Sequence, residues 1–355
     1  MDEQMMEPSA LDAFVQKSMS DTAGAMAILL AYIGDQTGIF RAMAAVGPAE
    51  PDRIAEHAGV DPRYLTEFLS ACAAGGYVSY DPAEETFSLS PAQAWGLTRE
   101  GEPGCMQGFF QAAVAQMITV DKAIEVLRSG AGRAWSEHHS CCFCGTDRFF
   151  RPGYVAYLVN EWLPALDGVV EKLTAGAKVV DIGCGRGAST VIMAQAFPNS
   201  HFLGIDFHGP SIEAAQAQAE AAGVTDRCRF EVRAAKQLIE GDFDLACIFD
   251  ALHDMGDPVG AAVHIRSNLK SDGTFVIVEP LAGDSLVDNL HLLGQVYYSF
   301  STLVCVPTSR AQEVGLGLGA QAGEARLTRV LNEAGFSQVR RAAETDSNMV
   351  LEARV

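Results

Sequence analysis

The sequence predicts an α/β protein with a doubly wound parallel sheet in its C-terminal half and a helical, winged-helix domain at its N-terminus. Three observations support this prediction. Apolar strands alternate with helices from Lys178 onward, and a glycine-rich turn joins the first strand of this series to its first helix. Before residue 97, helical segments are followed by a hairpin pattern, which is the element order of a winged helix.

Length, composition and charge limit the possible functions. The chain has 355 residues, enough for two domains, and its 48% hydrophobic content is typical of a globular protein. The formal net charge is −20, so we expect no nucleic acid and no anionic membrane as partner, since both require clustered Lys and Arg. Neither a signal-like N-terminus nor an apolar run of about eighteen residues is present. We therefore expect a cytoplasmic protein whose nine cysteines stay reduced.

Residues 1–96 are expected to form the winged-helix domain. Asp61 and the proline after it begin the second helix of a pair, and a hairpin turns at Asp81-Pro82. Many winged helices bind DNA, but this second helix carries Arg63 as its only base, against Asp61 and Glu67. Without positive charge it has no affinity for phosphates. We therefore interpret the domain as a packing or dimerisation module.

Residues 97–175 are expected to be a helical connector and a cap over the active site. The string HHSCCFCG at residues 138–145 is expected to interrupt the helical periodicity. A helix then resumes at RFFRPGY, with Pro152 near its first turn.

Residues 176–355 are expected to form the cofactor-binding catalytic domain. Apolar strands indicate burial on both faces, and therefore a Rossmann-like, doubly wound parallel sheet. The last two strands are separated by only a few residues, so they must pair antiparallel. The seven expected strands are 178–183, 201–207, 227–234, 243–250, 273–280, 337–344 and 348–355.

The string VVDIGCGRGAS gives the clearest binding signal. Gly183, Gly185 and Gly187 permit a tight turn and close approach of a ligand, and the next helix offers free backbone N–H groups. The string also satisfies the fingerprint G-x-G-x-x-A, so a NAD-dependent oxidoreductase is one alternative. Asp181 favours a different ligand, because an acid at this strand end repels a pyrophosphate and suits an ammonium group. Asp206 ends the next strand, where it can accept hydrogen bonds from ribose hydroxyls, and S-adenosylmethionine carries both groups.

Together, DIGCGRG, GIDF, IFDALHD and the closing antiparallel strands resemble class I S-adenosylmethionine-dependent methyltransferases. The resemblance extends to the N-terminal winged helix, which small-molecule O-methyltransferases of the plant and bacterial polyketide type use to dimerise. RFFRPGY, VEP…GD…DN and QEVGLGLGAQAGEARL resemble a bacterial branch typified by an uncharacterised mycobacterial methyltransferase. The resemblance implies a seven-stranded methyltransferase sheet, S-adenosylmethionine as cofactor and a homodimer.

The resemblance also implies the cofactor-binding residues. Many relatives place an acid after the third strand to accept the adenine amino group, but Ala234 stands there in this chain. The implied contacts are Asp181, Gly183, Cys184 and Gly185 toward the methionine portion, Asp206 toward the ribose, Phe207 and the Ala235 backbone toward adenine, and Asp250 toward the transferred methyl.

The segment ALHDMGD follows the fourth strand at the sheet edge where such folds bind ligands. It resembles the L-H-D-W segment of winged-helix O-methyltransferases, which implies that His253 is the general base; an imidazole has a suitable pKa. Asp254 is either a second catalytic group or the cap of the next helix. The long segment 281–320 is expected to be a lid or substrate wall, or else packing. The candidate substrate residues are Tyr154, His291, Tyr298 and Cys142.

Three cysteines, Cys141, Cys142 and Cys144, lie within four positions. A structural zinc site would require a second C-x-x-C pair, and none is present. A redox dithiol lacks the thioredoxin-type context. The remaining alternatives are thiols without function and a soft site for a thiophilic substrate, such as arsenite or a sulfur or selenium species.

These observations predict an S-adenosylmethionine-dependent methyltransferase acting on an oxygen or sulfur atom of a small molecule, for example a thiol or sulfide. One alternative is methylation of a thiophilic metalloid. The other is a ligand-sensing winged-helix regulator with a degenerate methyltransferase domain. No metal site is predicted.

Overall fold

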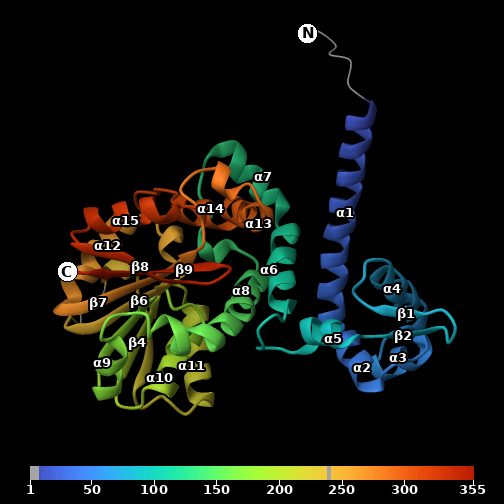
Figure 1. Ribbon diagram of the computed structural model, residues 1–355, viewed down its shortest axis with the longest axis horizontal. Coiled ribbons are helices and arrows are strands. Elements are labelled where there is room, and N and C mark those ends of the chain that lie inside the picture. Colours follow the sequence, from blue (N-terminus) through green and yellow to red (C-terminus); the bar gives the residue numbers. More distant parts are fainter. Residues whose placement is uncertain (1–7, 238–240) are drawn as a thin grey trace, which may run out of the picture. The chain divides into compact units, whose positions relative to one another are not determined.

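We describe a computed structural model of the chain, which covers residues 8–237 and 241–355 (Figure 1). The chain divides into two compact units. The first contains the residues up to Ile118 together with Ser140–Pro152, and the second contains Thr119–His139 and Gly153–Val355. Residues 97–175, the expected connector, are thus shared between the two units. Residues 1–7 of the expected winged-helix domain lie outside the described residues.

The first unit has the expected helix, turn, helix and hairpin order. Asp61 caps α4 by accepting hydrogen bonds from the backbone N–H groups of Arg63 at 2.9 Å and Tyr64 at 3.1 Å. In the hairpin, Tyr80 pairs with Phe87 across antiparallel strands. The elements are α1 (Pro8–Thr37), α2 (Ile39–Val46), α3 (Pro51–Ala58), α4 (Pro62–Ala74), β1 (Ser79–Asp81), β2 (Thr86–Ser88), α5 (Pro91–Thr98), α6 (Gln107–Ile118) and α8 (Ser140–Gly153), whose last residue belongs to the second unit.

Apolar side chains at helical spacing form the core of the first unit. Leu65 and Leu69, one turn apart on α4, are fully buried together with Phe40 and Met43 of α2. Burial of such a side chain contributes about 1.5–3 kcal/mol relative to leaving it exposed. This core holds the helices of the winged-helix domain together.

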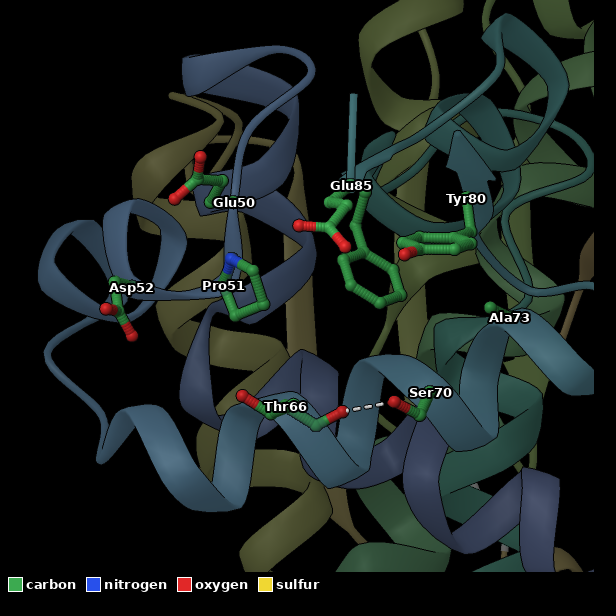
Figure 2. A pocket seen from close by; sticks show the side chains of 9 residues that line it. Glu50, Pro51, Asp52, Thr66, Ser70, Ala73, Tyr80 and Glu85 are labelled. Carbon is green, nitrogen blue, oxygen red and sulfur yellow. Dashed lines mark hydrogen bonds between the residues drawn. The ribbon is translucent and has the colours of Figure 1, made fainter. Parts of the chain in front are cut away.

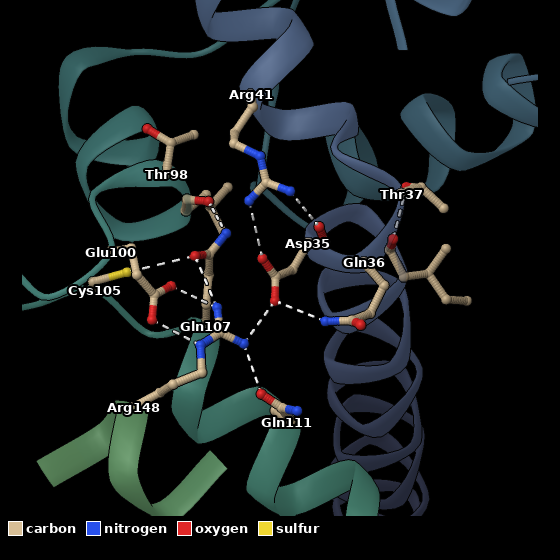
Figure 3. Close-up of polar contacts among 12 residues, drawn as sticks. Asp35, Gln36, Thr37, Arg41, Thr98, Glu100, Cys105, Gln107, Gln111 and Arg148 are labelled. Atoms are coloured by element: carbon tan, nitrogen blue, oxygen red, sulfur yellow. Dashed lines mark hydrogen bonds and ion pairs between the residues drawn. The ribbon is translucent and has the colours of Figure 1, made fainter. Parts of the chain in front are cut away.

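A polar network around Arg148 of α8 also stabilises the first unit (Figure 3). The guanidinium binds Glu100 through two hydrogen bonds of 2.8 and 2.6 Å, and a third of 2.9 Å reaches Asp35 of α1. It donates to Gln111 of α6 as well, at 2.7 Å. Asp35 is only 4% exposed, so its charge depends on this partner.

The expected break in helical structure at HHSCCFCG is wrong, because the three cysteines lie inside α8. Gly145 does not end the helix; instead it permits close packing. A Cβ at Gly145 would lie 2.5 Å from the backbone nitrogen of Ala112 on α6. Pro152 lies at the end of α8 rather than in a first turn, and a π-helical segment follows it directly.

The second unit is the expected α/β domain. Its elements are α7 (Val120–Ser129), η1 (Trp135–Glu137), η2 (Tyr154–Trp162), α9 (Val169–Ala175), β3 (Lys178–Ile182), α10 (Ala188–Ala196), β4 (His201–Asp206), α11 (Gly209–Ala221), β5 (Cys228–Val232), η3 (Ala235–Gln237), β6 (Phe243–Phe249), η4 (Leu252–Asp254), α12 (Pro258–Asn268), β7 (Leu269–Pro280), η5 (Val287–Asn289), α13 (Leu292–Phe300), η6 (Ser301–Cys305), α14 (Val306–Arg310), α15 (Gly323–Glu333), β8 (Gln338–Glu344) and β9 (Asn348–Arg354).

The seven strands form one sheet in the order β5-β4-β3-β6-β7-β9-β8. The first five pair in parallel, whereas β9 pairs antiparallel with both β7 and β8. This arrangement confirms the predicted doubly wound sheet and its closing antiparallel strands. The strand order reverses between β3 and β6, and ligands of such sheets bind at the carboxyl ends of the strands near this point.

Among the described residues, no single helix is both long enough and apolar enough to span a membrane. The segments Ser9–Thr37 and Ile39–Val46 reach that length and hydropathy only when taken together, and they meet at a bend of 70°.

Candidate active site

A glycine turn connects β3 to α10 at the carboxyl edge of the sheet. Gly183, Gly185 and Gly187 have φ angles of 70°, 54° and 81°, a region that side chains disfavour. A Cβ at Gly187 would lie 2.8 Å from the Phe230 ring. At Gly185, by contrast, a Cβ would meet no atom within 4 Å. The turn is therefore packed against the protein at Gly187 and faces open space at Gly185.

Asp181 lies beneath this turn and is 1% exposed. Its Oδ2 accepts hydrogen bonds from the hydroxyls of Ser189 at 2.7 Å and Thr190 at 2.6 Å. Its Oδ1 is buried and has no hydrogen-bond partner. Burial raises the pKa of Asp181 from 3.8 to about 6, although the two hydroxyls act in the opposite direction. The free Oδ1 is an acceptor that suits an ammonium donor.

Asp206, at the end of β4, holds the turn from the other side. Its Oδ2 accepts from the backbone N–H of Gly185 at 3.0 Å, and its Oδ1 accepts from that of His208 at 2.8 Å. Burial raises the pKa of Asp206, while these two donors lower it. The next residue, Phe207, is 50% exposed, so its ring can be covered by a flat apolar group. Cys184, within the turn, is buried at 8% exposure.

Among the described residues of the turn after β5, 233–237, none is an acid that could bind a ligand. Ala234 and Ala235 are partly buried, and η3 begins at Ala235. Residues 238–240 lie outside the described residues.

Asp250 directly follows the central strand β6 and has a left-handed conformation, with a φ of 49°. Its backbone N–H donates to the carbonyl of Val278 at 2.8 Å, and its Oδ1 accepts from Nδ2 of Asn348 at 2.7 Å. Its Oδ2 is buried without a hydrogen-bond partner. Burial and the nearby Glu279 charge raise the pKa of Asp250 well above its ordinary value. This left-handed φ is a conformation that residues other than glycine adopt infrequently.

His253 lies three residues farther on, in η4, and is 4% exposed. Its Nδ1 shares a hydrogen bond with Oε2 of Glu279, which is 1% exposed near the end of β7. The other oxygen of Glu279 accepts from the backbone N–H of Leu252 at 2.9 Å. Glu279 therefore fixes both the ring and the short helix that carries it.

The charges around His253 stabilise its protonated form. Burial alone lowers the pKa of His253, but Glu279 and Asp254 outweigh it and raise the pKa well above the usual value. Asp254 Oδ1 lies 3.3 Å from Nε2, on the side opposite Glu279. Asp254 does not cap α12; Asp257 does, by accepting from the N–H of Gly260 at 2.8 Å.

Cys305, at the end of η6, lies against the same ring. It is 6% exposed, and its sulfur lies within 4.8 Å of a ring nitrogen of His253 and a carboxylate oxygen of Asp254. Burial raises the pKa of its thiol to about 12. The sequence assigned no role to Glu279 or Asn348, and it placed Cys305 only within segment 281–320, the expected lid or substrate wall. A glutamate within the apolar strand GTFVIVEP was the available signal for Glu279.

The predicted substrate residues have different environments. Tyr154 is buried, and its ring centroid lies 5.5 Å from that of Phe249, which precedes Asp250. Tyr298 is partly buried, while the neighbouring Tyr297 is buried and donates to the carbonyl of Ser347 at 2.7 Å.

The other two predicted substrate residues, His291 and Cys142, occupy structural positions. His291 is exposed, and its Nδ1 accepts from the N–H of Gly294 as the N-cap of α13. Cys142 belongs to the first unit, where it is 2% exposed, and Gln116 Nε2 lies 3.5 Å from its sulfur.

Two domain models match the chain. Residues 173–335 match the model described as "Methyltransferase domain". The second unit contains a methyltransferase domain. Residues 24–99 match the model described as "Rv2258c-like winged HTH domain", which confirms the predicted winged helix.

Solved structures with the same fold cover nearly the whole chain. The mitomycin 7-O-methyltransferase MmcR has a TM-score of 0.71 at 19% identity, covering 98% of this chain and 100% of the other. An O-methyltransferase family protein from Burkholderia thailandensis gives 0.71 at 15% identity, covering 98% of each chain. Human N-acetylserotonin methyltransferase gives 0.67 at 15% identity, covering 100% and 99%, and was solved with S-adenosylmethionine. These structures confirm the predicted methyltransferase fold and agree with the predicted cofactor.

Two curated relatives each match 27% of the chain. The tRNA (guanine-N(7)-)-methyltransferase of Edwardsiella ictaluri is 35% identical over 109 residues, which cover 27% of this chain and 46% of the relative. An uncharacterised protein of Synechococcus is 29% identical over 98 residues, covering 27% of this chain and 24% of that protein. The chain thus spans less than half the length of these relatives.

Proposed function

We propose that the protein transfers the methyl group of S-adenosylmethionine to an oxygen or sulfur atom of a small molecule. The observation that carries the proposal is the glycine turn, with Asp181 and Asp206 at adjacent strand ends. The unpartnered Asp181 Oδ1 suits the ammonium of the cofactor, and the open space at Gly185 gives room for its methionine portion. When bound, the cofactor supplies an electrophilic methyl group on a sulfonium.

The residues of the chain would position the acceptor and manage its proton. Asp250 and His253 follow β6, and Glu279, near the end of the neighbouring strand β7, shares a hydrogen bond with His253. With its Nδ1 hydrogen held toward Glu279, a neutral His253 presents the lone pair of Nε2 to an acceptor hydroxyl, as a general base requires. Tyr154 and Phe249 provide an apolar wall that excludes water.

How strongly the rate depends on proton removal by His253 is determined by whether the acceptor atom is oxygen or sulfur. A hydroxyl needs its proton removed in the transition state, which is worth about 10²–10⁴-fold in rate. A thiol has a pKa of about 8.5 and ionises more readily. Substitution of His253 should therefore cost less with a thiol acceptor than with a hydroxyl.

The winged-helix unit is proposed to dimerise rather than to bind nucleic acid. Arg63 on α4 is paired with Glu67 at 2.5 Å, so its charge is offset. A nearby surface pocket of about 620 Å³ is lined by three carboxylates, Glu50, Asp52 and Glu85, and by no lysine or arginine (Figure 2). These charges disfavour a DNA-binding regulator, the second candidate. In the described part of the chain the nine cysteines form no disulfide, which supports the cytoplasm as the proposed location.

A product screen tests the proposal. The purified chain is supplied with methyl-labelled S-adenosylmethionine and panels of phenols, thiols, sulfide and arsenite, and formation of S-adenosylhomocysteine is followed. Methylation of a phenol or thiol is the expected result, and methylation of arsenite alone would favour the metalloid alternative. Tight, sequence-selective DNA binding with no turnover would favour the regulator.

A further inference from the structure

The three donor atoms of His253, Asp254 and Cys305 lie together at the sheet edge. One nitrogen of the imidazole, a carboxylate oxygen and the thiol sulfur are all within 4.8 Å of one another. Within residues 8–237 and 241–355, no second group of three or more His, Cys, Asp or Glu side chains brings its ligand atoms this close together. We propose that these three side chains bind a thiophilic divalent cation, of which zinc fits the donor set best.

The donor types and their number fit a catalytic rather than a structural zinc site. Zinc accepts nitrogen, sulfur and carboxylate oxygen at about 2.0–2.3 Å, and structural sites use four protein ligands. Catalytic sites use three and leave one position for water or substrate. The Asp254 side chain is 22% exposed whereas that of His253 is 5% exposed, so solvent reaches the cluster from the side of Asp254.

The geometry between Asp254 and His253 is that of two ligands rather than of a hydrogen bond. Nε2 and Oδ1 are 3.3 Å apart, which is close to the edge of a zinc tetrahedron with bonds of about 2.0 Å. Oδ1 is nevertheless buried without a hydrogen-bond partner. A cation between the two atoms would satisfy an oxygen that otherwise stays buried and unpartnered.

Glu279 occupies the position of an outer-shell partner. Metal-binding histidines usually give their other ring N–H to a carboxylate, which fixes the tautomer and the ring orientation. Here Nδ1 of His253 meets Oε2 of Glu279, leaving Nε2 to face Asp254.

The negative charges around His253 also favour a bound cation. Asp250, Asp254 and Glu279 gather around a single imidazole, and in the described part of the chain no salt bridge joins any of the three to Lys or Arg. Buried carboxylates without cationic partners are costly, and a divalent cation would offset them.

This inference rests on the proposed function and narrows it. A metal on Nε2 and a proton acceptor at Nε2 exclude each other, so with zinc bound His253 serves as a ligand. The open fourth position would then take a thiolate, which is the softest of the candidate acceptors.

Cobalt(II) titration of the full, chelator-treated chain tests the site without measuring turnover. We expect one equivalent to bind with a thiolate-to-cobalt charge-transfer band and intense visible bands of tetrahedral cobalt, and zinc to displace it. The variant Cys305→Ser should lose the charge-transfer band, while the double variant Cys141→Ser, Cys144→Ser should keep it. Glu279→Gln should weaken binding by about 10–100-fold.

Asp254→Asn provides a second ligand variant if Cys305→Ser fails to fold, as judged by circular dichroism. The proposal is overturned if saturating cobalt gives no charge-transfer band, if the band survives in folded Cys305→Ser, or if folded Asp254→Asn binds cobalt as tightly as the wild type. S-Adenosylhomocysteine binding, measured separately by calorimetry, tests the proposed function. Cofactor binding without cobalt bands would overturn only the metal site, and cobalt bands without cofactor binding would overturn only the proposed function.

Discussion

Nδ1 of His253 and Oε2 of Glu279 share a hydrogen bond in which both partners are almost fully buried. Glu279 also accepts from the backbone N–H of Leu252. A single carboxylate therefore fixes the tautomer and orientation of the imidazole and the position of the short helix η4 that carries it. The charge of Glu279 keeps a proton on His253 up to an unusually high pH. A base in this position must lose the proton on Nε2 before it can act.

Glu279→Gln should therefore change the pH profile of methylation as well as its rate. Removing the carboxylate charge lowers the pKa of His253, so the acidic limb of the profile should move to lower pH. The maximal rate should fall at least tenfold, because glutamine offers one acceptor oxygen where Glu279 uses two, one toward His253 and one toward the Leu252 N–H. Rates are measured on chelator-treated protein with a phenol acceptor over a range of pH. An acidic limb that stays in place would contradict this role for Glu279.

Asp206→Asn should weaken cofactor binding. Hydrogen bonds to charged groups are worth about 1.5–3 kcal/mol, which corresponds to about 10–150-fold in affinity. Asp206 accepts from the backbone N–H of Gly185 in the glycine turn and from that of His208 after β4, and its replacement disturbs both hydrogen bonds. Calorimetric titration with S-adenosylhomocysteine measures the loss. Asp226→Asn is the matched control, because that side chain is 72% exposed and should leave the affinity unchanged.

Asp181 should make cofactor affinity depend on pH. Its carboxylate must be ionised to receive an ammonium, and its pKa in the fold is about 6. Affinity should therefore fall as the pH drops through about 6. Asp181→Asn should bind weakly with no such dependence, and a wild-type affinity that stays constant across this range would rule out the ammonium contact.

The contribution of Asp181 to the free energy of unfolding should decrease as the pH rises, whereas cofactor affinity should increase. The pKa of Asp181 is raised above its ordinary value of 3.8, so the folded state holds the proton more tightly than the unfolded state. The stability contributed by this group is fully present below about pH 3.8 and is lost as the pH rises through about 6. Urea unfolding of the wild type and of Asp181→Asn, compared across that range without cofactor, measures the difference.

Arg148→Ala should destabilise the first unit by about 3–5 kcal/mol, the usual cost of leaving a buried charge without its partner. Asp35, at 4% exposure, would keep the guanidinium of Arg41 at 3.5 Å as its cationic partner and the amide of Gln36 at 3.2 Å. Chemical denaturation followed by circular dichroism measures the change. Arg63→Ala removes an exposed ion pair and should cost at most about 1 kcal/mol. Equal losses in the two variants would show that the network adds nothing.

The long helix α1 should mediate the proposed dimer. Phe14 and Met19 are both 67% exposed on this helix, and contiguous exposed apolar residues of this kind mark interfaces. The double variant Phe14→Glu, Met19→Glu should therefore be monomeric by light scattering. Leu292→Glu, at a position of the second unit that is 79% exposed, should leave the mass unchanged. A monomeric wild type would remove the basis for the dimer.

The order of strands and helices, the glycine turn and the acids at the strand ends could be predicted from the sequence. Each depends on neighbours along the chain: an apolar run forms a buried strand, and glycine at successive positions permits the left-handed turn that follows β3. The helical state of the cysteine segment could not be predicted locally. It depends on the close approach of α8 to α6, which Gly145 permits.

By itself, the sequence determined the class of fold, the cofactor loop and the position of His253 at the sheet edge, because these follow from periodicity and short spacing. Only the tertiary structure decided which groups surround that histidine. Glu279 and Cys305 are 26 and 52 residues away in sequence, and the pairing of β6 with β7 and the folding of η6 bring them to the ring. The protonation and ligand chemistry of an imidazole depend on charges within a few ångströms, and sequence spacing does not encode that distance.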